Sequence, residues 1–434
     1  MLAAPSLAPV LAFLLAALFL VQPDTTDTPP VLDVPDLRPQ PRLPEIPIAD
    51  DSTDENRVTI RPRLAPSALY SDARGFGIGA GVNVQNLGFA GSDLSLDVRA
   101  SQRLQSLSAS AYTGDRYEEP VYGFVSVVAS TTTRRRYFGI GPFTSEDNRL
   151  FLDYGSLDAE ARLGIYPLGH TGLYVQPGAR FLLDRLRDVE ADQPGALERL
   201  REIDPSSVAA IEDGDVLDQT RYGVSLGLQV ASDLRDWRAY PRSGTFVSAE
   251  ARRFVAMDGS GLRFNRFAGN TLGYLPIRGR TALVGRATLV LTRSDDDADI
   301  PFYYLPVLDA ALLTAYPPDR FVGRDVLALG GGLRFPIRDF IGVYGIDALI
   351  MGYLGNAYNN VFEEFEASIT FDSAPIANDG NAPLRPALGL GLGIVNLDKE
   401  RVVLGGLVGI SPEGIALASL RIAYDLRDAR PLFR

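Results

Sequence analysis

The stretch from Arg221 to Ala231, RYGVSLGLQVA, decides the fold class because its side chains alternate in polarity at every second residue. The even positions from Tyr222 to Val230 are large and apolar, whereas the odd positions carry only arginine, glycine, serine, glutamine and alanine. Successive side chains of a β-strand point to opposite faces of its sheet. The stretch is therefore predicted to be a strand with one apolar face and one polar face.

The same alternation recurs along the chain in segments of about ten residues, separated by turns rich in Gly, Asp, Asn and Pro. In Leu94–Arg99 apolar and polar residues alternate strictly, and in Ile415–Leu426 one face is apolar while the other carries Ser419, Arg421 and Asp425. Sixteen such strands are predicted. Their approximate spans are 58–70, 75–86, 92–103, 105–115, 121–133, 148–166, 172–185, 220–233, 243–256, 262–277, 280–293, 325–337, 341–353, 384–396, 401–410 and 413–426.

These strands are predicted to form an all-β fold, a 16-stranded antiparallel transmembrane β-barrel. After residue 56 no apolar run reaches the roughly 18 residues of a membrane helix. A secreted β-sandwich or β-solenoid would also alternate, but the polar faces are rich in Arg, Ser and Gly, and no helical layer covers the apolar faces. An even strand count also places the three longest connections, 186–219, 294–324 and 354–383, at the outer end of the barrel.

The chain is predicted to have three parts. Residues 1–22 are uncharged and apolar up to Val21, which is typical of a signal peptide, with an uncleaved anchor as the alternative. Residues 23–56 are rich in Pro and Asp and are predicted to be a disordered periplasmic linker. Residues 57–434 form the barrel domain, which we expect in a bacterial outer membrane.

Composition argues against most enzyme classes. The chain has no cysteine and one histidine, His170, which excludes thiol nucleophiles, Cys-ligated metals and two-histidine metal sites. With 54 acidic and 42 basic residues the formal charge is −12, so a nucleic-acid partner is not expected. We expect no enzymatic activity, no cofactor and no metal. The expected partners are outer-membrane lipid and lipopolysaccharide, and client outer-membrane proteins or a periplasmic protein.

The polar faces carry a set of charged residues that we expect to line the lumen. They are Arg99, Arg221, Arg252, Arg286, Arg334 and Arg421, with Asp97, Glu250 and Asp425. Two interpretations stay open: a network that braces the lumen wall, or one that selects ions or solutes.

Several segments resemble the barrel of the BamA/TamA superfamily, the "bacterial surface antigen" domain. Ser67–Tyr70 with Gly75–Gly79 is similar to its opening hairpin. The segment 136–148 resembles its "F-x-G-x-G" connection through Phe138, Gly139 and Gly141. The segment 233–244 resembles its "D-x-R … P-x-x-G" periplasmic turn through Pro241 and Gly244. Phe321–Pro336 resembles the strand after its sixth outer loop, and the likeness extends over about residues 58–426.

The resemblance implies assembly or translocation of outer-membrane proteins through a seam between the first and last strands. The chain departs from the family in having the Pro/Asp linker, and no POTRA domain, ahead of the barrel. The family's L-R-G-Y motif corresponds to Leu313, Thr314, Ala315 and Tyr316, so Thr314 replaces the arginine. Its usual aspartate partner corresponds to Tyr353. The alternative function is therefore a channel or structural barrel that handles no client.

The sixth outer loop, residues 294–324 and called loop six below, is expected to fold into the lumen from Pro301 to Arg324. Its segment 301–306, PFYYLP, is too apolar to stay in water. With the motif arginine lost, we expect packing by Tyr316 and hydrogen bonds from lumen arginines to replace the ion pair. The alternative is a loop across the mouth that leaves the pore open. Trp237 and Tyr240, near a periplasmic turn, are expected in an interfacial aromatic belt.

Overall fold

The structure is a computed structural model that describes residues 59–63, 69–71, 75–85, 92–113, 121–167, 172–189, 198–199, 202, 219–236, 240–295, 299–308, 313, 315–317, 319–340, 344–372, 380–397 and 401–422. The predicted signal peptide, 1–22, and linker, 23–56, lie outside the described residues. No helix in the described part of the chain is long and apolar enough to cross a membrane.

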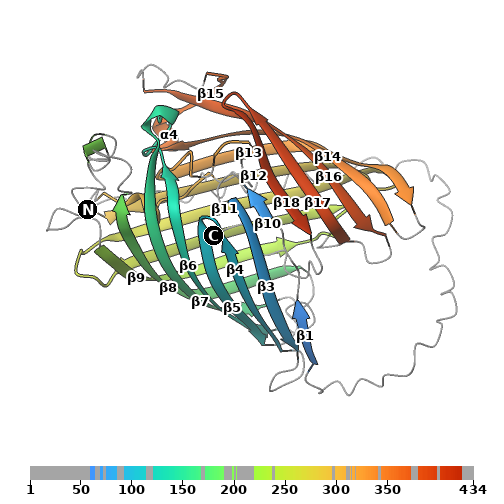
Figure 1. Cartoon of the computed structure of the whole chain (residues 1–434), viewed down its shortest axis with the longest axis horizontal. Coiled ribbons are helices and arrows are strands. Elements are labelled where there is room, and N and C mark those ends of the chain that lie inside the picture. The colour runs from blue at the N-terminus through green and yellow to red at the C-terminus, as the bar shows by residue number, and fades with distance from the viewer. Residues whose placement is uncertain are drawn as a thin grey trace.

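The described strands form one sheet of 18 members (Figure 1). They are β1 (Thr59–Arg63), β2 (Leu69–Ser71), β3 (Gly75–Gln85), β4 (Asp93–Ser101), β5 (Leu104–Thr113), β6 (Val121–Tyr137), β7 (Leu150–Ile165), β8 (Leu173–Val189), β9 (Gln219–Asp233), β10 (Gly244–Ala256), β11 (Arg263–Arg278), β12 (Thr281–Ser294), β13 (Asp325–Phe340), β14 (Tyr344–Tyr358), β15 (Phe365–Ile369), β16 (Ala382–Asn396), β17 (Arg401–Ser411) and β18 (Gly414–Ile422). From β3 to β14, and from β16 to β18, each strand pairs antiparallel with the next, and β14 pairs with β16.

The sixteen predicted strands are confirmed, with two differences. The predicted strand 58–70 is two short strands, β1 and β2, on the same edge of β3. The chain uses eleven residues from Thr59 to Leu69 where β3 uses nine from Gln85 to Gly77, so one regular register cannot span both. The short strand β15 was not predicted, because five residues in a long connection carry too little pattern.

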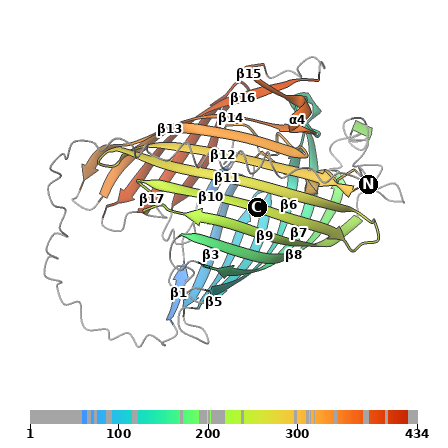
Figure 2. The same cartoon turned by 180° about the vertical axis from the view of Figure 1, so that it is seen from behind.

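The two faces of the wall differ as the alternation predicted. On β9, the outward Leu226 is 61% exposed, whereas its neighbour Ser225 on the inner face is only 5% exposed. Figure 2 shows the long strands β8 to β14 side by side in this wall. In a membrane the exposed apolar face would lie against lipid.

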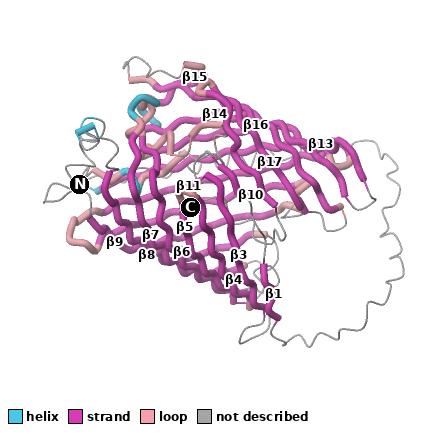
Figure 3. The backbone as a smooth tube through the Cα atoms, viewed as in Figure 1, coloured by secondary structure: helices cyan, strands magenta, loops and turns pink. Residues whose placement is uncertain are grey.

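The helical turns gather at the end of the barrel where the long connections lie (Figure 3). Helix α4 (Val361–Glu364) follows β14, and the amide of Phe362 donates to the Asn360 side chain at its N-terminus (3.2 Å). β15 then pairs parallel with the start of β16. The sequence segment 362–366 is thus a short helix turn and the beginning of a strand.

Candidate functional site: the lumen and the strand seam

Loop six packs against the inner face of the wall in two places. In the first, Phe302 and Tyr304 join a buried cluster with Tyr137, Phe254 and Phe264 at the outer ends of β6, β10 and β11. The ring centroids of Tyr137 and Phe302 are 4.3 Å apart, and those of Phe254 and Tyr304 are 4.8 Å apart. Aromatic pairs at such separations stabilise a contact beyond the area that they bury. The apolar segment 301–306 is therefore buried.

The second contact lies across the lumen on β12 to β16. Leu308, Leu313, Tyr316 and Phe321 of the loop form a buried cluster with wall residues that include Tyr353. The Tyr316 hydroxyl donates to the carbonyl oxygen of Pro386 (3.1 Å). Of the four residues at the motif position, Leu313, Ala315 and Tyr316 are buried, and Thr314 lies outside the described residues. The described parts of 301–324 therefore fold into the barrel, as expected.

The expected anchoring of loop six by Tyr316 and by an arginine bond to Asp319 is present, but the expectation that these contacts replace an ion pair is wrong, because loop six has an ion pair outside the motif. Arg320 is fully buried, and its Nε lies 3.0 and 3.1 Å from the two carboxylate oxygens of Glu413 in the β17–β18 turn. Asp319 accepts two further hydrogen bonds from Arg135 of β6 (3.0 and 3.2 Å). The sequence comparison considered only position 314, and Arg320 stands six residues later outside the motif. Aromatic packing and ion pairs thus anchor the loop together.

The two ends of loop six are joined at its neck. Asp325, which begins β13, is fully buried and accepts from both Nη atoms of Arg293 near the end of β12. The same carboxylate accepts from the backbone amides of Thr292 (3.2 Å) and Val361 (2.9 Å). Four donors on one carboxylate satisfy a buried charge. The start of the loop, its end and helix α4 are therefore tied at one point.

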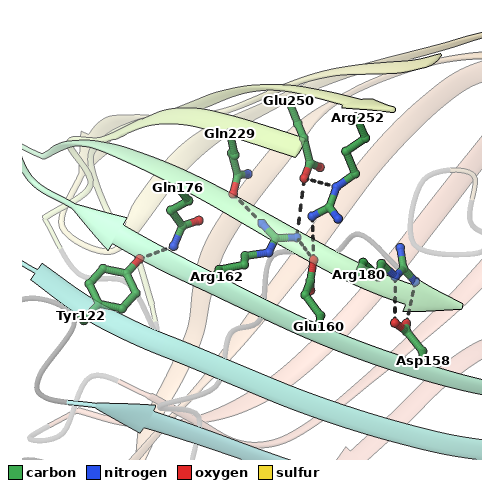
Figure 4. Close-up of polar contacts among 9 residues, drawn as sticks. All are labelled: Tyr122, Asp158, Glu160, Arg162, Gln176, Arg180, Gln229, Glu250 and Arg252. Atoms are coloured by element: carbon green, nitrogen blue, oxygen red, sulfur yellow. Dashed lines mark hydrogen bonds and ion pairs between the residues drawn. The ribbon is translucent and has the colours of Figure 1, made fainter. Parts of the chain in front are cut away.

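A network of charged side chains covers the inner face of β7 to β10 (Figure 4). Glu160 accepts from Arg162 (2.9 Å) and Arg252 (2.6 Å), and Glu250 pairs with both of these arginines. We call this network, together with the neighbouring pair Asp158–Arg180, the charged wall. Its three acids and three arginines lie on β7, β8 and β10, and Arg162 also donates to Gln229 of β9 (2.8 Å), so the network braces four adjacent strands.

Glu250 and Arg252 of the charged wall were predicted from the sequence, and four other members were not. The missed residues are Asp158, Glu160, Arg162 and Arg180. They alternate along β7 and β8 with the same period of two that revealed the others, so the signal was present in the sequence. Lysine is absent from the network, and arginine suits it because one guanidinium can bridge two carboxylates.

The remaining predicted lumen residues do not join this network. Arg221 pairs with Asp258 at the outer end (3.3 Å), and Arg99 is exposed on the same face of β4 as Asp97. Arg286 lies on β12 opposite Gly330. Arg421 lies in β18 opposite Gly405, and its side chain is not described; Asp425 lies outside the described residues. The predicted network is therefore divided among separate places along the wall.

Arg334 belongs to a different cluster, at the end of the barrel opposite the long connections. Its guanidinium lies 3.9 Å from the ring centroid of Tyr240 and donates to the carbonyl oxygen of Pro241. The Tyr240 hydroxyl donates to Asp347, which also accepts from Arg280 (3.1 Å). Burial, reinforced by the hydrogen bond to Asp347, raises the pKa of Tyr240 above its usual value.

Tyr240 is only 4% exposed, so its expected place in an interfacial belt is wrong, and Trp237 lies outside the described residues. The turn between β9 and β10 bends inward because Asp236 accepts from the amides of Arg242 and Ser243 (2.9 and 3.1 Å). Gly244 ends the turn at φ +93°, where a Cβ would lie 2.1 Å from the Leu234 oxygen. The turn therefore lies against the lumen face of β13 and β14.

The other segments that resemble the superfamily lie close to loop six. Phe138 is fully buried, Gly139 and Gly141 have φ of +106° and +91°, and the Gly141 amide donates to Val322 of the loop (2.7 Å). Pro336 lies in β13, beside a register shift in its pairing with β14. The segment around 138–141 thus supports the returning arm of loop six.

No family model matches the sequence, and no curated protein matches it. Among solved structures, the chain is similar to BamA from Haemophilus ducreyi lacking POTRA domains 1–3, with a TM-score of 0.56 and 14% identity. The fold is that of the BamA barrel. The match covers 82% of this chain and 66% of that one, so this chain spans just under two thirds of its length. Two CdiB proteins are also similar. The protein from Escherichia coli has 9% identity and a TM-score of 0.49, and the match covers 81% of this chain and 62% of that one. The protein from Acinetobacter baumannii has 11% identity and a TM-score of 0.46, and the match covers 82% of this chain and 61% of that one.

The seam of this BamA-like barrel lies where β18 meets β2. β2 has three residues, Leu69–Ser71, whereas neighbours such as β4 and β5 pair from Asp93↔Tyr112 to Ala100↔Gln105. Among the described strands, β1 pairs only with β3, and no pairing joins it to β18. Within the described residues, the wall is therefore joined over a shorter length at the seam than between the long strands from β3 to β14.

Proposed function

We propose that this protein resides in the bacterial outer membrane and assists the assembly or translocation of other outer-membrane proteins through the β2–β18 seam. The short β2 is the observation that carries the proposal. The BamA-like fold supports it at the level of architecture. Outer-membrane lipid and lipopolysaccharide surround the barrel, and client proteins are its transient partners.

The chemistry of the seam is backbone hydrogen bonding. A strand whose edge is unpaired presents free N–H and C=O groups, and an incoming segment can pair with them by strand addition. Among the described strands, only the three residues of β2 lie beside the free edge of β18, so the rest of that edge has such groups to offer. A client hairpin would pair with that edge and fold against it, without needing a cofactor or a catalytic side chain.

Disulfide trapping of the seam tests this proposal. The chain has no cysteine, so Tyr70→Cys combined in turn with cysteine at Ala416, Leu417, Ala418 or Ser419 gives unambiguous cross-links. The barrel is placed in liposomes and an urea-denatured eight-stranded outer-membrane barrel is added as client. We expect client folding to be faster with the reduced protein than in empty liposomes, and the acceleration to disappear when the seam is oxidised.

The control cross-links two neighbouring strands that are already paired along their length. Leu96→Cys with Ala109→Cys faces cysteines across β4 and β5, so its disulfide leaves the seam free. Oxidation of the control should keep the acceleration. Equal client folding with the seam open and trapped would refute the proposed function.

A channel is the second candidate, and the charged wall is the observation that favours it. Rings or rows of charged side chains in a lumen can select ions. The two buried contacts of loop six oppose an open pore. Planar-bilayer recording distinguishes the two: a channel would give large, steady currents from the intact protein, and the same currents after deletion of 301–322.

A further inference from the structure

Arg320 of loop six and Glu413 of the last hairpin form the most deeply buried ion pair that the structure describes. The two side chains are 0% and 2% exposed, and Nη2 of Arg320 lies 2.9 Å from Oε1 of Glu413. Nη1 and Nη2 also donate to Oγ1 and the carbonyl oxygen of Thr144 (2.6 and 2.8 Å). One guanidinium therefore joins three segments that are far apart in the sequence.

Aromatic rings enclose the pair. The guanidinium carbon of Arg320 lies 5.1 Å from the ring centroid of Phe138 and 4.8 Å from that of Phe321. Both contacts are within cation–π range, and the rings exclude water from the charges. Removing one partner would leave an uncompensated charge in this enclosed place. The junction is thus destabilised when one charge is removed and the other remains.

Glu413 stands immediately before β18, the strand of the seam. The turn that holds it is short: the Glu413 amide donates to Ser411 Oγ (3.3 Å), and β18 begins at Gly414. A position fixed for Glu413 therefore fixes the outer end of β18. No residue of loop six other than Arg320 has an ion pair with this hairpin in the described part of the chain.

Loop six also touches β17 directly. A Cβ at Gly409 would lie 2.4 Å from the backbone nitrogen of Ala315, so only glycine lets the loop lie this close to the strand. Ala315 itself has φ +96°. The loop thus holds the β17–β18 hairpin at two points, one on its strand and one at its turn.

We propose that Arg320 and Glu413 form a latch through which loop six keeps the last hairpin, and with it the β2–β18 seam, closed. The seam opens when this ion pair is broken, and movement of loop six releases it. The consequence for clients rests on the proposed function, whereas the latch itself is a property of the barrel alone. Arg320 and Glu413 are positioning residues for the seam and do not contact a client.

The rate of seam cross-linking under mild oxidant measures the latch without any client. The parent is the fastest-reacting pair of Tyr70→Cys with a β18 cysteine. Into it we introduce Arg320→Leu with Glu413→Leu, which removes both charges together, and separately Glu413→Gln, which keeps the shape of the side chain. We expect the cross-linking rate to fall about tenfold in each variant. A tenfold change in rate requires only part of the free energy that is lost when a buried ion pair is broken.

The matched control is Arg253→Leu with Asp295→Leu, an ion pair at the same outer rim that is about one-third exposed on each side and does not touch the hairpin. It should leave the rate unchanged. Heat-modifiable migration on gels verifies that each variant is folded. A cross-linking rate within about twofold of the parent in a folded double-leucine or Glu413→Gln protein would overturn the latch. Loss of client folding plays no part in this result, so the latch and the proposed function can fail separately.

Discussion

The inner faces on the two sides of the lumen are packed in different ways. On β7 to β10 the inner face carries the charged wall, whose acids and arginines pair with one another. Between the Arg334–Asp347 cluster and the buried Arg385, the inner face of β13 to β17 is mostly apolar and small, with Tyr353, Gly330, Gly389 and Gly409, and we call this part the glycine wall. Charges on the first side pair with one another within the wall, whereas the small, mostly apolar side chains of the glycine wall pack against the apolar residues of loop six. The difference shows that the position of the loop is encoded by the wall as much as by the loop.

The largest effect is expected on the glycine wall from Tyr353→Ala. The Tyr353 ring is buried beside Gly330 and Gly389, where a Cβ would lie 3.1 and 2.9 Å from its carbon atoms. Deleting a buried aromatic ring costs about 3–5 kcal/mol because a cavity remains. Urea unfolding in detergent micelles, followed by the fluorescence of the single tryptophan, measures the loss. An unchanged midpoint would show that the glycine wall does not depend on this ring.

Gly409→Val should be the next largest. The added side chain would meet the backbone of Ala315, which cannot move without lifting the loop. Overpacking of this kind costs about 1–3 kcal/mol, and we expect partial release of loop six with new single-channel currents. Gly285→Val is the control, since no atom lies within 4 Å of its Cβ. Equal currents from both variants would contradict the prediction.

The charged wall should tolerate a single loss better. In Arg252→Met, Glu160 keeps Arg162 at 2.9 Å and Glu250 keeps it at 3.6 Å, so no carboxylate is left without a cation. We expect a cost of about 1 kcal/mol in the same urea experiment, because a network shares its partners. A loss as large as that of Tyr353→Ala would remove the contrast between the two walls.

The smallest effect is expected at the outer rim. The hydrogen bond from Arg253 holds the pKa of Asp295 below its ordinary value. Desolvation acts in the opposite direction, but its effect is small because both side chains are partly exposed. A lowered folded-state pKa adds stability above the unfolded value of about 3.9, and this stability is lost as the pH falls through the folded value. Arg253→Ala should therefore cost at most about 1 kcal/mol at pH 7, and nothing at about pH 2. Measuring urea midpoints at both pH values tests this.

The strands could be predicted because their faces meet different surroundings, which imposes a period of two on nearly every segment. The alternation gives each residue a face, and it placed Glu250 and Arg252 on the inner side. The alternation does not give the register in which two strands pair, so the contact of Arg162 with Glu250 could not be predicted. Pairing register is set by the whole sheet rather than by a single segment.

The contacts of loop six are harder to predict from sequence patterns than the strands are. Arg320 lies in a segment without periodicity, and its partner Glu413 follows 93 residues later in a short turn. Neither residue belongs to a motif that sequence comparison would align. Tyr240 was misplaced for a related reason, because an aromatic residue in the turn between β9 and β10 can face either outward or into the lumen, and the backbone bonds to Asp236 decide between them.

The ion pair of Arg293 with Asp325 at the neck of loop six bears on whether the peptide chain must be continuous through the loop. Because the pair and the β12–β13 ladder already hold both ends of the loop together, closing it adds little entropic cost to folding. A break in the peptide chain between Leu308 and Leu313 would therefore leave each new end anchored by its own side chains, Leu308 on one side and Leu313 on the other. The barrel could then be made from two separately expressed fragments that find each other through the wall.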